Sequence, residues 1–169
     1  MPELPEVEAG RKIAERTGRG HRIDAVTVAD DPIVFEGVSP ARIRRALRGR
    51  TVVDTHRHGK HFWLELDARP AVVFHFGMTG ALYAYREQAD RPRFWKIELV
   101  FDHGLRLAMT NARRLGRIRL RDNPGQEPPI ADLGFDPYTE MPSPAEFASA
   151  LRSRQGVVKG VLLNQSFAA

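Results

Sequence analysis

The sequence predicts a mainly β protein, an antiparallel sandwich or barrel with flanking helices. Beyond residue 50, short apolar runs rich in Val, Ile, Phe and Trp are separated by Gly, Asp or Pro, a rhythm typical of antiparallel strands. Helical patterns lie mostly before and after these runs. The predicted strands are Thr51–His58, His61–Leu66, Ala71–Phe76, Ala81–Tyr85, Phe94–Phe101, Arg106–Met109 and Arg117–Arg121.

Three elements are expected before these strands. Residues 5–18 predict a helix, with proline at the first position, an acid in the first turn and apolar residues on one face. Residues 23–28 alternate in the manner of a half-buried strand. Ser39 and Pro40 are typical of a helix start, and the short helix that they begin should end near Leu47.

The C-terminal part has a different composition. Residues 122–142 form a proline-rich, acidic connector, so we expect the chain to divide into 1–142 and 143–169. A helix should follow over 145–152, and a second helical pattern covers 157–167. The apolar residues of this last pattern that we expect to be exposed are Val161, Leu162 and Phe167.

Composition and charge narrow the class of partner. The chain has 169 residues, with 26 Lys plus Arg against 21 Asp plus Glu and a pI near 10.1. Basic residues gather in 42–60 and 103–121, and acids in 122–140. This distribution favours a bound phosphate backbone, although solvated faces would also explain it. With no cysteine, the chain has no disulfides and no thiolate metal site.

Neither a signal peptide nor a membrane span is indicated. The N-terminus carries acids rather than Lys or Arg, and no apolar run approaches about 18 residues. We therefore expect a cytoplasmic protein without membrane contact.

The N-terminus offers unusual chemistry. If Met1 is removed, Pro2 presents a secondary amine that can attack an electrophilic carbon and carry it as an iminium. Glu3 is close enough to deliver or accept a proton. The alternative is an ordinary capped helix start with Met1 retained, in which Pro2 is an unreactive amide.

Three predicted turns also carry candidate residues. Lys60 follows Gly59 at a turn, in a place that suits a phosphate contact. The glycine-bracketed loop 75–80 would expose Met78 at its tip, and loop 111–116 combines two arginines with a leucine. Such loops suit DNA contact through cations and an apolar wedge. A solvated lysine, a core methionine and a plain basic turn are the alternatives.

Together these segments resemble the formamidopyrimidine-DNA glycosylase and endonuclease VIII family. The resemblance implies a two-layer antiparallel β-sandwich, with the N-terminal helix at its active-site end. A helix–two-turns–helix DNA-binding domain and usually a zinc finger would follow. Residues 1–142 would then be the catalytic sandwich and 143–169 the start of the second domain, and no cofactor is expected in this chain. The matching segments are MPELPEVE at 1–8, GK at 59–60, HFGMTG at 75–80, ARRLGR at 112–117 and LLNQSFAA at 162–169.

The resemblance also implies catalytic roles. Pro2 would be the nucleophile that attacks the anomeric carbon of the sugar, expels the damaged base and leaves a Schiff base. Glu3 would protonate the ring oxygen of the sugar, and Glu6 would help to hold the site. Lys60 would also belong to the catalytic residues, since the resemblance implies that it contacts a phosphate near the lesion.

The implied DNA-binding residues lie in the two loops. His75 and Arg114 would contact phosphates near the lesion. Met78, Arg113 and Leu115 would fill the gap that a flipped nucleotide leaves in the stack. Many family members carry an aromatic residue where this chain has Leu115, so stacking on the orphaned base should be weaker here.

The expected function is a bifunctional DNA glycosylase and abasic-site lyase of base excision repair. Its substrate would be double-stranded DNA that carries oxidised purines, namely formamidopyrimidine or 8-oxoguanine, and we expect it to act as a monomer at the bacterial nucleoid. One alternative is the oxidised-pyrimidine specificity of the endonuclease VIII branch. The other is a truncated DNA-binding remnant without catalytic activity.

Overall fold

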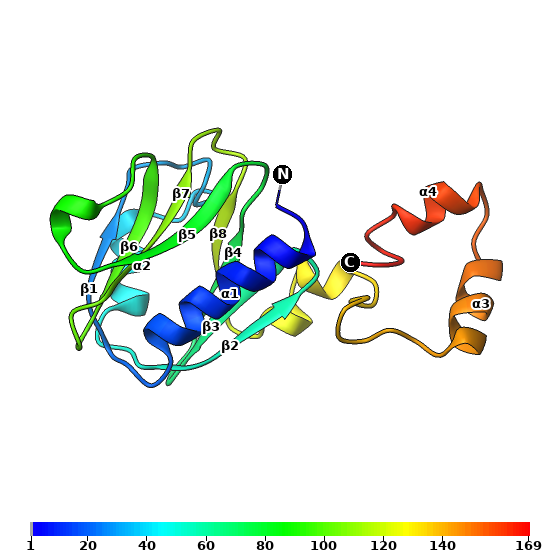
Figure 1. The fold of residues 1–169 in the computed structure, drawn as a ribbon, viewed down its shortest axis with the longest axis horizontal. Coiled ribbons are helices and arrows are strands. Elements are labelled where there is room, and N and C mark those ends of the chain that lie inside the picture. Colours follow the sequence, from blue (N-terminus) through cyan, green and yellow to red (C-terminus); the bar gives the residue numbers. More distant parts are fainter. Residues whose placement is uncertain (1) are drawn as a thin grey trace.

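The computed structural model describes residues 2–169 and shows a two-layer sandwich of antiparallel sheets (Figure 1). One sheet has the strand order β1-β6-β7-β5 and the other β2-β3-β4-β8. The predicted mainly β fold is confirmed, as a sandwich rather than a barrel. The strands are β1 Ile23–Val28, β2 Val52–His58, β3 His61–Leu66, β4 Ala71–His75, β5 Gly80–Tyr85, β6 Trp95–Phe101, β7 Arg106–Asn111 and β8 Arg117–Arg121.

The core lies between the two sheets. Alternate residues of β3 and β4 point inward, and Phe62 and Phe74 stack there with ring centroids 5.0 Å apart. Leu99 and Leu107 face them from the other sheet and are equally buried. The period-2 pattern of the sequence therefore places one apolar face of each sheet in the interior.

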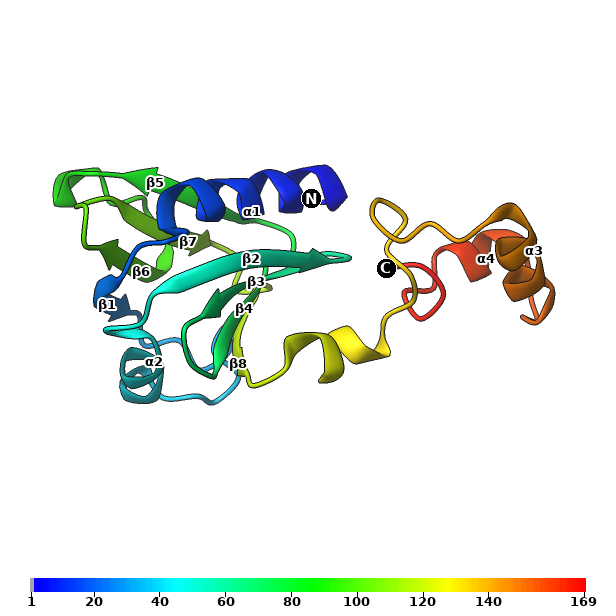
Figure 2. The same cartoon turned by 90° about the horizontal axis from the view of Figure 1, so that it is seen from below.

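Helix α1, Leu4–Gly18, lies along one open edge of the sandwich and packs against both sheets (Figure 2). Its buried residues include Val7 and Ala14, as the predicted apolar face requires. Helix α2, Pro40–Leu47, covers β1, and its first turn is capped by the Ser39 hydroxyl, which accepts from the backbone N–H of Arg42 at 3.3 Å. Both predicted helices are confirmed.

The C-terminal helices stand to one side of the sandwich (Figures 1 and 2). They are α3, Pro144–Arg152, and α4, Val158–Leu162. The connector before them is not wholly irregular, because it contains 3-10 helices at Pro124–Gln126 and Ile130–Asp132. A further 3-10 helix, Gln88–Asp90, lies between β5 and β6. No helix within residues 2–169 is long and apolar enough to cross a membrane.

The prediction for the last segment was wrong in two respects. Helix α4 ends at Leu162 rather than near Phe167, because the Asn164 side chain accepts from the backbone N–H of Ser166 and the chain turns. Phe167 then packs edge-on against Phe135 and Phe147, with centroids 5.7 Å from each. Phe167 and Val161 are both buried, whereas Leu162 is exposed as expected.

Candidate active site and nucleic-acid interface

Helix α1 begins at the candidate nucleophile. Pro2 is half-buried next to Glu3, whose backbone N–H donates to Oε2 of Glu6 at 2.9 Å. This hydrogen bond and that from the N–H of Glu6 itself hold the pKa of the Glu6 carboxyl below its ordinary value. Glu6 thus serves as the cap of the first turn. The removal of Met1, on which a free amine at Pro2 depends, concerns a residue outside the described part of the chain.

Lys60 contacts this helix start directly. It lies in the turn between β2 and β3, and its Nζ forms an ion pair with Oε2 of Glu3. Gly59 makes the turn possible: its φ is +55°, and a Cβ there would come within 2.7 Å of Ala169. The fold therefore brings Pro2, Glu3 and Lys60 together from two distant parts of the sequence.

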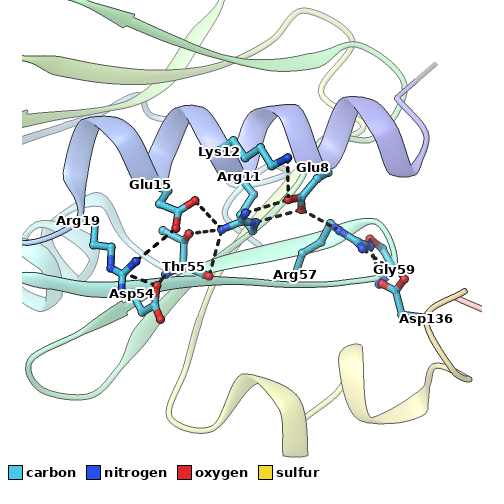
Figure 3. Close-up of polar contacts among 10 residues, drawn as sticks. All are labelled: Glu8, Arg11, Lys12, Glu15, Arg19, Asp54, Thr55, Arg57, Gly59 and Asp136. Carbon is cyan, nitrogen blue, oxygen red and sulfur yellow. Dashed lines mark hydrogen bonds and ion pairs between the residues drawn. The ribbon is translucent and has the colours of Figure 1, made fainter. Parts of the chain in front are cut away.

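A buried ionic network fixes this turn to α1 (Figure 3). Arg57 of β2 donates through Nε to Glu8 of α1 at 3.2 Å and through its Nη atoms to Asp136 of the connector. Asp136 also accepts from the backbone N–H of Gly59 at 2.8 Å. The Arg57 side chain is 2% exposed and that of Asp136 0%, so solvent screens this pair little.

The charges of this network are stabilised by hydrogen bonds. Burial disfavours the ionised form of Asp136, but donors from Arg57, Tyr138 and Gly59 outweigh it and lower the pKa of that carboxyl. The pKa of Glu8 is also lowered, chiefly by its hydrogen bond from Arg11. The network is therefore ionised at neutral pH and ties α1, the 59–60 turn and the connector together.

Two histidines lie immediately beside Lys60. His61 of β3 pairs with His75 of β4, and their rings stack with centroids 4.6 Å apart. Burial lowers the pKa of His61 to about 3 and that of His75 to about 4, and nearby positive charges add to the effect. Both rings are neutral at neutral pH, so His75 can offer a phosphate a hydrogen bond but no charge.

This pair makes stability depend on pH. The folded pKa of each ring lies below the ordinary 6.5, so the unfolded chain binds more protons once the pH falls below about 6.5. Each ring should then cost about 1.4 kcal/mol of unfolding free energy per pH unit. Urea unfolding at pH 7 and pH 5 should show this loss, and His61→Phe should reduce it markedly. An equal loss in both proteins would contradict the assignment.

The two loops predicted to meet DNA pack against each other. Loop 76–79 and loop 112–116 are joined by the buried Asn111, whose amide donates to the carbonyl of Phe76 at 2.8 Å and accepts from the N–H of Gly116 at 3.0 Å. Gly77 has a φ of +61°, and a Cβ there would lie 2.4 Å from the backbone of Leu115. Only glycine allows the loops to approach this closely.

The side chains at the tip of these loops are exposed and apolar or basic. Met78 is 41% exposed and Leu115 42%, and the exposed Arg113 donates its backbone N–H to the hydroxyl of Thr79 at 3.3 Å. Exposed apolar residues on two rigidly joined loops are available for contact with a partner. This agrees with the tip expected for Met78, Arg113 and Leu115, whose roles stay predictions.

Arg114 turns away from this tip. With a φ of +56°, it forms a bidentate pair with the buried Asp31 at 3.0–3.1 Å, and Lys96 binds the same carboxylate at 2.7 Å. Burial opposes ionisation of Asp31, but these partners and the N–H of Val34 lower its pKa to about 2. Arg114 therefore anchors the loop, and a phosphate contact would have to use its remaining exposed face.

The ends of the strands place these turns on one side of the molecule. His61 pairs with His75, and His75 pairs in turn with Arg117, so the turns 59–60, 76–79 and 112–116 share one end of the sandwich. The first turn of α1 reaches the same end through the contact between Lys60 and Glu3. Every predicted site residue therefore lies at this end, with Arg114 bound inward.

The basic blocks are less uniform than a continuous phosphate track requires. Helix α2, which holds Arg42, Arg44 and Arg45 of the first block, lies at the opposite end of the sandwich (Figure 2). In the second block, Arg117 and Arg119 pair with Glu36, the latter through two hydrogen bonds of 2.6 Å. Much of the charge asymmetry thus reflects intramolecular pairs and a distant face.

The sequence did not reveal the residues whose ion pairs fix the turn 59–60 and the loop 112–116 in place. These residues are Asp31, Arg57 and Asp136. Arg57 and Asp136 are 79 positions apart in the sequence, and Asp31 and Arg114 are 83 apart, so no local pattern links the partners. The available signal was weak: Asp136 follows an aromatic residue and precedes a proline within the connector. Pairing at such separation is set by the fold.

Comparison with known proteins agrees with this geometry. The family model of the formamidopyrimidine-DNA glycosylase N-terminal domain matches residues 1–118. The chain is 37% identical to a formamidopyrimidine-DNA glycosylase of Arabidopsis thaliana, and the match covers 99% of this chain and 46% of that protein. It is 33% identical to a formamidopyrimidine-DNA glycosylase of Geobacter metallireducens, with 100% of this chain and 62% of that protein covered. The Lactococcus lactis enzyme, bound non-covalently to DNA containing an abasic site, has the same fold, with a TM-score of 0.84 at 23% identity over 99% of this chain and 64% of that one. The chain thus spans less than two thirds of each relative.

Proposed function

Because the chain belongs to the formamidopyrimidine-DNA glycosylase family, we propose that it acts in base excision repair as a DNA glycosylase on damaged double-stranded DNA. The observation that carries the proposal is the ion pair of Lys60 with Glu3, next to Pro2. It joins a candidate nucleophile, a candidate acid and a candidate phosphate-binding cation at the end of the sandwich that carries the exposed loop tip.

The proposed reaction begins at the amine of Pro2 once Met1 is gone. The amine nitrogen bonds to C1′ of the damaged nucleotide, the C1′–N bond to the base breaks, and the bond electrons leave with the base, which takes up a proton. The Glu3 carboxylate takes the proton that the amine loses on bonding to C1′ and donates it to the sugar ring oxygen, so that the ring opens. The product is an iminium between Pro2 and C1′.

The same intermediate explains a lyase step. The iminium makes the C2′ protons acidic, and removal of one allows the C3′–O bond to break with the phosphate as leaving group. Hydrolysis then returns the free amine. Oxidant and reductant are not needed, because the electron pairs stay within the sugar and the departing phosphate.

Lys60 has a second role in this proposal. Its side chain is 27% exposed, and its ammonium is already in contact with Glu3. A phosphate next to the lesion would compete for that ammonium, and its arrival would free the Glu3 carboxylate to take part in proton transfer. His75 and the outer face of Arg114 would add phosphate contacts on the same side.

The exposed loop tip would hold the opened duplex. Met78, Arg113 and Leu115, all exposed, would enter the space left by a flipped nucleotide. Because the loops are locked by Asn111 and Gly77, the tip can unstack bases without itself collapsing. Residues 1–142 would supply catalysis, and 143–169 would begin a DNA-binding domain.

Oxidised purines are the proposed lesions, since the similar proteins are named for formamidopyrimidine. Processed protein lacking Met1 should release formamidopyrimidine or 8-oxoguanine from duplex oligonucleotides at least about tenfold faster than thymine glycol. Release can be measured by mass spectrometry of the free base, with an undamaged duplex as control.

Two outcomes would replace this proposal. Preferred release of thymine glycol would assign the chain to an oxidised-pyrimidine activity. Binding of every duplex without release of any base, and without nicking at a preformed abasic site, would identify a DNA-binding remnant.

A further inference from the structure

A group of three potential metal ligands lies away from the catalytic end. His21 follows α1 and precedes β1, and Asp102 and His103 form the turn between β6 and β7. Helix α1 has 15 residues and is therefore about 20 Å long. Its first turn meets Lys60 and its last residue is close to His21, so the two sites lie at opposite ends of the helix (Figure 1).

The three donor atoms lie close together. Nδ1 of His21 lies 2.9 Å from Oδ1 of Asp102, and Nδ1 of His103 lies 3.7 Å from the same oxygen. All donor atoms of the group lie within 4.8 Å of one another. A tetrahedral ion with bonds of about 2.0–2.1 Å separates its ligands by about 3.3 Å. The observed separations lie on both sides of that value, and because an ion lies in the plane of each imidazole that binds it, one of the two stacked rings has to turn out of the stack for both to bind.

The protein leaves one of these donors unused. The Nδ1 atom of His103 is buried and has no hydrogen-bond partner among residues 2–169. Its ring stacks on that of His21, with centroids 3.7 Å apart and an angle of 10° between planes. A buried nitrogen without a partner is unfavourable unless something binds it.

The backbone holds the carboxylate in place. The second oxygen of Asp102 accepts from the N–H of Arg22 at 3.1 Å, and the N–H of Asp102 donates to the carbonyl of Arg22 at 2.9 Å. Oδ1 therefore stays directed at the two imidazoles. The side chains of the three ligands are 28–39% exposed, so an ion can enter from solvent.

We propose that His21, Asp102 and His103 bind a divalent transition-metal ion, with Zn²⁺ as the best match. Two imidazole nitrogens and one carboxylate oxygen suit Zn²⁺ better than Ca²⁺ or Mg²⁺, which prefer oxygen ligands. The fourth position would hold water. The site contains no thiolate and is formed within the sandwich, so it is distinct from any cysteine zinc finger.

Binding would fasten the end of α1 to the β6–β7 turn. These two segments are far apart in sequence, and within residues 2–169 they meet here through Asp102, His21 and Arg22. An ion that binds only the folded form shifts the unfolding equilibrium by mass action. Zinc should therefore raise the melting temperature without any change at the catalytic end.

The test is a Zn²⁺ titration of the 169-residue protein in competition with a chromophoric chelator. We expect one ion per chain, with binding weakened at least about tenfold in His103→Asn and in Asp102→Asn. His56→Ala is the matched control: His56 is 38% exposed, against 39% for His21, and also contacts a carboxylate, Glu65. This control should bind zinc as the parent does.

A second measurement tests the proposal even if a variant folds poorly. Imidazole ¹⁵N spectra of the parent should show two nitrogens that shift on zinc addition, both of the Nδ1 type, and a melting-temperature rise that is absent in His103→Asn. Zinc binding that survives in both His103→Asn and Asp102→Asn, or that is lost in His56→Ala, would overturn the proposal. Neither readout depends on DNA repair activity.

Discussion

Processed protein in which Pro2 is replaced by glycine will lose base excision by at least about 100-fold, since it loses a positioned nucleophile. Glycine also leaves an amine at the N-terminus, but a primary one on a freely rotating residue. A secondary amine gives a cationic iminium directly, whereas a primary amine gives an imine that must first be protonated. Borohydride trapping on an abasic-site duplex measures the covalent intermediate, which should fall in parallel.

Two controls define this result. Pro5→Ala changes a proline in the same helix start and leaves the amine intact, so it should retain both excision and trapping. Protein shown by mass spectrometry to keep Met1 should give no adduct, because its Pro2 nitrogen is an amide. A normal adduct yield from that unprocessed protein would exclude Pro2 as the nucleophile.

Replacing Asp136 with alanine should destabilise the fold by about 3–5 kcal/mol, as expected when one partner of a buried ion pair is removed. Arg57 would then keep a buried charge with only Glu8 as an acidic partner, and the N–H of Gly59 would lose its acceptor. Urea unfolding followed by fluorescence of Trp63 and Trp95 measures the change in the free energy of unfolding.

The neighbouring carboxylate provides the comparison. Asp132→Ala removes an exposed acid from the same connector and should change stability by less than about 0.5 kcal/mol. The double variant Arg57→Leu with Asp136→Leu should recover part of the loss, because it leaves no unpaired buried charge at this pair. If Asp136→Ala were as stable as Asp132→Ala, the network would not hold the 59–60 turn.

Local chemistry in the sequence determined the elements and the identity of the candidate site. The predicted strands and the first two helices agree with the structure to within about two residues, since alternation and proline or serine at helix starts act over a few neighbouring positions. The same short range makes MPELPEVE or HFGMTG recognisable as motifs. Chemistry carried by adjacent residues, such as Pro2 with Glu3, is therefore visible without coordinates.

Only the tertiary structure decided which distant residues meet. The pairing of Arg57 with Asp136, the inward turn of Arg114 to Asp31 and the contact of Lys60 with Glu3 depend on strand order and on the path of the connector. Tertiary packing also explains why α4 ends early. The burial of Phe167 against Phe135 outweighs the helical pattern of residues 163–167. Periodicity records which face of an element is apolar, but the partner of a buried charge or ring is chosen by the packing of the whole chain.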